Sequence, residues 1–110
     1  EEDKKGGFRD LIYGTNRVYR ILMRSVEPEK VTTEISKYLV KYGVKQVDLV
    51  KPGTLVPGGH YYNIYVPISH LKEFFSLVMK DKEALLFENK TWRGKTPRGM
   101  SQVLIWIKSV

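Results

Sequence analysis

The sequence predicts a single domain of the α+β class, in which two helices pack on one face of an antiparallel sheet. Residues 28–42 and 69–82 repeat apolar side chains at the spacing of an amphipathic helix. Other segments alternate apolar and polar residues, as half-buried strands do. The 110 residues, 42% hydrophobic and 28% charged, have the size and composition of one independent folding unit.

The chain divides into a tether and a domain. Residues 1–16 are charged and glycine-containing, which predicts a tether whose apolar part, residues 8–13, could pack back on the domain as a short arm. Because the chain begins without methionine, we expect it to be part of a longer protein or to have been processed. Residues 17–110 are predicted to form strands and helices in the order strand, helix, strand, strand, helix, strand, strand, at 18–26, 28–42, 44–51, 61–68, 69–82, 85–92 and 102–110.

Capping residues set the helix boundaries. Pro28 suits the first position of a helix, and Gly43 supplies the left-handed residue that ends it. Ser69 is the predicted N-cap of the second helix. This order of elements is typical of a ferredoxin-like βαββαβ sandwich with an extra C-terminal strand.

Proline and glycine mark the predicted loops. Residues 54–59 contain a Pro-Gly pair and read as a loop between two strands. Residues 93–99 contain two glycines and a proline, which favours a terminal hairpin made of the last two strands.

Strand alternation predicts which side chains face away from the helices. If Tyr62, Ile64 and Val66 face the helices, their neighbours on the same strand face outward, and the first and last strands divide in the same way. The outward set contains aromatic residues interleaved with cations, and its candidate binding residues are Arg20, Arg24, Tyr61, Tyr65, Trp106 and Lys108.

The charge is strongly positive. A net charge of +7 and a pI near 9.6 favour an acidic protein, a nucleic acid or anionic lipid headgroups as partner. Part of the excess positive charge lies in a predicted basic loop. This loop could bind phosphate or an acidic partner, or it could be an ordinary solvated loop. Its cations are Lys90, Arg93, Lys95 and Arg98.

The sequence carries no recognisable catalytic constellation. Without cysteine it has no disulfide, zinc-thiolate site or catalytic thiol, and this composition fits a reducing cytosol as well as a periplasm. No carboxylate is spaced from His60 or His70 so as to share a metal or general-base site with it. We therefore expect both histidines to be exposed or to cap a helix. No nucleotide-binding glycine loop is present, and the longest apolar run, residues 103–107, is too short to cross a membrane. We therefore predict a non-enzyme without metal or cofactor that does not itself span a bilayer.

Several functions fit the outward face. A single-stranded nucleic acid could stack its bases on Tyr61, Tyr65 and Trp106, with the cations of the face on its phosphates, as in RRM domains. Residues 60–67 nevertheless lack the glycine-aromatic pattern of the RRM motif. The arm or a second copy of the domain could cover the face instead. A small-molecule sensor of the ACT type would place its ligand at a subunit interface near residues 52–60.

The chain from Val18 onward resembles the small extracytoplasmic domain that follows the membrane helix in some bacterial zinc-finger anti-sigma factors. The resemblance rests on the charged tether, on residues 18–21 and the helix after them, on residues 62–67 leading into a helix with Leu71 and Phe74, and on residues 97–99 before the closing run 103–107. It implies a sensory or protein-interaction domain of a membrane-anchored, periplasmic regulator. The zinc finger and sigma-binding part of that family lie upstream of these residues, so no functional residue carries over.

Overall fold

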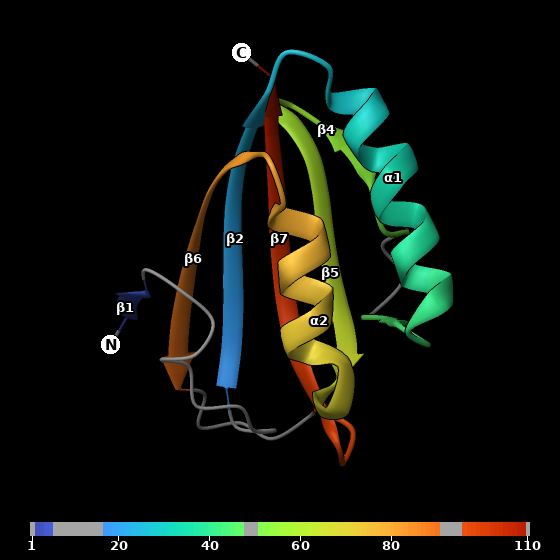
Figure 1. The fold of residues 1–110 in the computed structure, drawn as a ribbon, viewed down its shortest axis with the longest axis vertical. Coiled ribbons are helices and arrows are strands. Elements are labelled where there is room, and N and C mark those ends of the chain that lie inside the picture. The colour runs from blue at the N-terminus through green and yellow to red at the C-terminus, as the bar shows by residue number, and fades with distance from the viewer. Residues whose placement is uncertain (1, 6–16, 48–50, 91–95, 110) are drawn as a thin grey trace.

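The computed structural model describes residues 2–5, 17–47, 51–90 and 96–109. In these residues two helices pack against one face of a seven-stranded sheet, which confirms the α+β class (Figure 1). The elements are β1 (Glu2–Lys5), β2 (Arg17–Ser25), α1 (Pro28–Lys41), β3 (Lys45–Gln46), β4 (Thr54–Val56), β5 (Gly59–Pro67), α2 (Ile68–Met79), β6 (Glu83–Lys90) and β7 (Met100–Ser109).

The sheet has the strand order β1-β6-β2-β7-β5-β3, and β4 also pairs with β5. Strand β7 runs parallel to β2 on one side and antiparallel to β5 on the other. The sheet is therefore mixed, and the prediction of an antiparallel sheet is wrong for the β2–β7 pair. In a ferredoxin-like sheet the strands that correspond to β2 and β5 are adjacent and antiparallel. Here β7 separates them, so the ferredoxin-like order is not confirmed.

The predicted terminal hairpin is wrong, because β2 lies between β6 and β7 and pairs with both. Hairpin strands are most often joined by two to five residues, whereas residues 91–99 separate β6 from β7. A connection of that length can span the roughly 10 Å that one intervening strand requires. The last strand thereby gains a neighbour on each side instead of one.

The end of α1 follows the sequence prediction, and the start of α2 does not. Gly43 has φ +63°, its N–H donates to Val40, and the Val44 N–H donates to the Leu39 carbonyl at 3.0 Å, the arrangement of a Schellman cap. Helix α2 begins at Ile68, so Ser69 lies inside its first turn and makes no side-chain cap. The Ile68 N–H instead donates to the carbonyl of Gly99 at 2.9 Å, so a tertiary bond replaces the cap.

The core lies between the sheet and the helices, as alternation predicts. The inward apolar residues of β2, β5 and β7 are at most 1% exposed, and burying one such side chain stabilises the fold by about 1.5–3 kcal/mol. The inward strand residues are Tyr19, Ile21, Met23, Tyr62, Ile64, Val66, Val103, Ile105 and Ile107, and the helices add mainly Ile35, Leu71, Phe74, Phe75 and Val78.

The segment before β5 differs from its prediction in two places. Of the strand expected at 44–51, residues 45 and 46 pair with β5, and residues 48–50 lie outside the described part of the chain. The loop expected at 54–59 contains β4, which pairs with β5 around a two-residue turn at Pro57 and Gly58. Gly58 has φ +95°, and proline followed by glycine at positive φ is typical of a type II turn.

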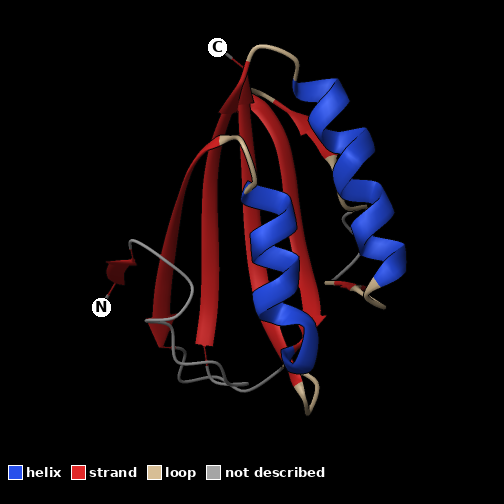
Figure 2. Cartoon of the chain, in the orientation of Figure 1, coloured by secondary structure: helices blue, strands red, loops and turns tan. Residues whose placement is uncertain are grey.

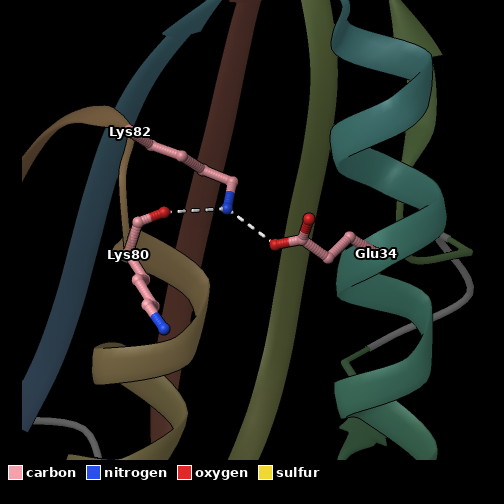
Figure 3. A network of polar contacts seen from close by, with 3 residues as sticks. All are labelled: Glu34, Lys80 and Lys82. Carbon is pink, nitrogen blue, oxygen red and sulfur yellow. Dashed lines mark hydrogen bonds and ion pairs between the residues drawn. The ribbon is translucent and has the colours of Figure 1, made fainter.

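An ion pair joins α1 to the turn after α2 (Figure 3). The Lys82 ammonium donates to the Glu34 carboxylate at 2.7 Å and to the Lys80 carbonyl at 3.2 Å. The Lys82 side chain is only 13% exposed, so this contact holds the α2–β6 turn against the first helix.

The predicted tether is described only in part. Residues 2–5 form β1, which pairs with β6 at one edge of the sheet, and the predicted arm at residues 8–13 lies outside the described residues. No helix among the described residues has the length and apolar character needed to cross a membrane.

Candidate functional site

Neither helix covers the second face of the sheet, which we call the open face (Figure 2). All the outward residues named from the sequence lie on it, because the buried residues of β2, β5 and β7 alternate with them. Their placement follows from the structure, and their role in binding stays a prediction.

The strand register arranges the open face in rows that run across β6, β2, β7 and β5. The residues of each row are paired directly from strand to strand. The charged row is Glu83, Arg24, Lys108 and Gly59; the apolar row is Leu85, Leu22, Trp106 and Tyr61; the mixed row is Phe87, Arg20, Leu104 and Asn63; the polar row is Asn89, Val18, Gln102 and Tyr65.

The apolar row forms the hydrophobic centre of the face. Leu22 and Leu85 are 40% and 43% exposed, large values for paired strand residues of this size. The Tyr61 and Trp106 rings meet edge to face, with centroids 6.2 Å apart. An open groove of about 540 Å³ lies against this row and is bordered by Arg24 and Lys108.

The cations of the face lie on both sides of the apolar row. Arg24 lies 3.8 Å from Glu83 in an exposed ion pair of the charged row, which contributes little to stability. The Arg20 guanidinium lies over the Phe87 ring, 5.5 Å from its centroid, in the mixed row. Lys108 is exposed near the end of β7. Three cations therefore face one anion across the described rows.

The structure separates the residues that the sequence grouped as stacking platforms. Tyr61 and Trp106 touch, but Tyr65 lies in the polar row, four residues or roughly 13 Å further along β5. In the polar row Gln102 donates to the side-chain oxygen of Asn63 at 2.8 Å. The face thus has one aromatic pair rather than a continuous aromatic track.

The sequence reasoning missed the contribution of β6. Leu85 and Phe87 extend the apolar and mixed rows, yet residues 84–87 are all apolar, so alternation could not assign their face. The signal appears only once β6 is paired with β2, because Leu22 lies opposite Leu85 and Arg20 opposite Phe87.

The other candidate sites are less complete. In the basic loop, Arg93, Lys95 and the side chain of Lys90 lie outside the described residues, and Arg98 is exposed just before β7. The 52–60 segment, where a sensor ligand was expected, borders an open hollow of about 710 Å³ between the β4–β5 turn and the start of α1.

The histidine prediction is wrong for His60. It lies within β5, is 8% exposed, and places Nδ1 3.0 Å from the Gly53 carbonyl, because even-numbered residues of β5 point inward. His70 is exposed on α2 beside Tyr42. Within the described ranges no three His, Cys, Asp or Glu side chains cluster as metal ligands would.

Comparison of the chain with protein-family models, with curated proteins and with solved structures found no match.

Proposed function

We propose that this domain is a non-catalytic protein-interaction module whose interface is the open face of the sheet. The observation that carries the proposal is the apolar row, with two half-exposed leucines beside an edge-to-face tyrosine and tryptophan. Contiguous exposed apolar patches mark interfaces, and Tyr, Trp and Arg are the residues that dominate interface energetics.

The same contacts favour a protein over a single-stranded nucleic acid. Bases stack on the faces of aromatic rings, and a single strand needs several such rings along its path. Here the Tyr61 and Trp106 rings meet edge to face, and Tyr65 lies apart from them in the polar row. Nucleic acid is therefore the weaker alternative for this face.

The finer predictions from the sequence remain predictions. They are the regulatory role in a larger membrane-anchored bacterial protein, the periplasmic location and the resemblance to an anti-sigma factor domain.

Affinity capture with matched variants tests the proposed interface. The immobilised 110-residue chain is exposed to a bacterial envelope extract beside Leu85→Glu and Val40→Glu, which alter an open-face leucine and an 84% exposed valine on α1. We expect Leu85→Glu to lose a protein that the parent chain and Val40→Glu both retain. Equal capture by all three chains would refute an interface on the open face.

A labelled single-stranded RNA, titrated at low and at physiological salt, tests the alternative. Saturable, salt-sensitive binding that Trp106→Ala abolishes would assign the face to nucleic acid instead.

A further inference from the structure

The apolar row has the dimensions of a short helix contact. Adjacent strands are about 4.8 Å apart, so the row from β6 to β5 extends across roughly 14 Å. An α-helix rises 1.5 Å per residue, and about ten residues cover that length. A partner helix lying along the row would place an apolar stripe of nearly three turns on Leu85, Leu22 and Trp106.

The rows on either side place positive charge beside such a helix. Each neighbouring row lies two residues along the strands, or roughly 7 Å away. A helix with side chains is about 10–12 Å wide, against roughly 14 Å between the two flanking rows. The long arginine and lysine side chains of these rows can close the remaining gap to residues that flank the apolar stripe. Arg24 and Lys108 lie on one side and Arg20 on the other, with Glu83 at the β6 end of the charged row.

Charge also argues against a second copy of this chain on the same face. The chain carries a net charge of +7, and a two-fold contact through the open face would bring the same cationic rows against each other. An acidic occupant instead places opposite charges at both borders of the apolar row.

We propose that the apolar row binds an amphipathic helix of a partner protein, with Leu-type or Phe-type side chains on its inner stripe and Asp or Glu on both flanks. This inference rests on the proposed function and specifies the chemistry of its partner.

Synthetic helical peptides of about 14 residues test the charge and the apolar stripe separately. The first has a leucine stripe with glutamate flanks, the second has the same stripe with lysine flanks, and the third has an alanine stripe with glutamate flanks. In a Trp92→Phe background Trp106 is the single tryptophan, so its fluorescence reports binding at the apolar row. We expect the first peptide to bind at least about tenfold more tightly than either control at low salt, and to weaken as salt rises.

Variants of exposed residues then locate the binding. Leu22→Glu is expected to weaken the first peptide at least about tenfold, while Val40→Glu on α1 leaves it unchanged. Arg24→Glu combined with Lys108→Glu is expected to reverse the preference, so that the lysine-flanked peptide binds better. Far-ultraviolet circular dichroism confirms that each variant is folded.

Each contrary outcome has a distinct meaning. Equal binding of the glutamate- and lysine-flanked peptides would overturn the acidic partner. Absence of peptide binding, together with capture that depends on Leu85, would overturn the helix and leave the protein interface standing. Binding that appears only after deletion of residues 8–13 would make that segment the occupant, and a dimer abolished by Leu22→Glu would make it a second copy; either result overturns the proposal.

Discussion

Replacing Gly59 by alanine tests the pairing of β5 with the central strand. Gly59 lies opposite Lys108 at the start of β5. A Cβ atom at this position would lie 2.1 Å from the Ile107 carbonyl oxygen and 3.0 Å from its carbon. Ordinary contacts with carbon are about 3.5–4.0 Å, and a backbone carbonyl cannot rotate away as a side chain can. Strands β5 and β7 would therefore have to separate locally by more than roughly 1 Å.

The expected cost follows from that separation. Overpacking typically costs about 1–3 kcal/mol, and a weakened ladder hydrogen bond adds about 1 kcal/mol, so we expect about 3 kcal/mol for Gly59→Ala. Gly43→Ala is the matched control, because Gly43 has φ +63° and nothing within 4 Å of the added Cβ. That control carries only the penalty of a left-handed alanine, about 1 kcal/mol.

Urea and thermal denaturation, followed by circular dichroism, measure both variants. We expect the melting temperature to fall by about 15 °C for Gly59→Ala and by about 5 °C for Gly43→Ala. A Gly59→Ala variant no less stable than Gly43→Ala would refute the Gly59–Lys108 register, and with it the placement of β7 beside β5.

Three further predictions concern the core and the helix contact. Burial raises the pKa of Tyr62 to about 12, above its unfolded value of about 10. The folded state therefore favours the protonated phenol, and the stability that depends on this phenol is complete below pH 10 and is lost as the pH rises toward 12. Tyr62→Phe should therefore remove part of the alkaline decline in urea midpoint, and an unchanged decline would contradict the burial of the phenol. Lys82→Met should lower the free energy of unfolding by about 1 kcal/mol or less, because Glu34 is 42% exposed. A double-mutant cycle with Glu34→Gln measures the coupling energy of the ion pair, and a coupling well above that value would contradict a solvent-screened contact. Ile105→Ala, at a fully buried site on β7, should cost about 3–4 kcal/mol in urea denaturation, and a loss under about 1 kcal/mol would argue against a central β7.

The faces of the strands could be predicted from the sequence because side chains alternate with a period of two, whatever the neighbouring strand. Tyr19 and Arg20, or Tyr62 and Tyr61, are assigned to opposite faces by that rule alone, and the structure agrees. Helix α1 followed from Pro28 and Gly43 for a similar reason, since both signals are local.

Strand order could not be predicted in this way, because periodicity assigns a face and not a neighbour. One signal pointed to the true position of β7. Residues 103–107 are apolar on both faces, which is typical of a central strand rather than of the edge of a hairpin. The rows of the open face depend on this order, so Leu22, Leu85 and Trp106 could not be brought together before the pairing was known.

The central position of the last strand has a consequence for synthesis on the ribosome. Until residues 100–109 leave the exit tunnel, β2 with β6 and β5 with its short partners lack the strand that joins them, so β2 and β5 each keep an unpaired edge that β7 later covers. The sheet is joined only when β7 enters between them, so this domain should complete its fold only after residues 100–109 have been made rather than progressively. The same geometry makes β7 a natural segment to supply in trans, as a peptide that restores the fold of a chain truncated before Met100.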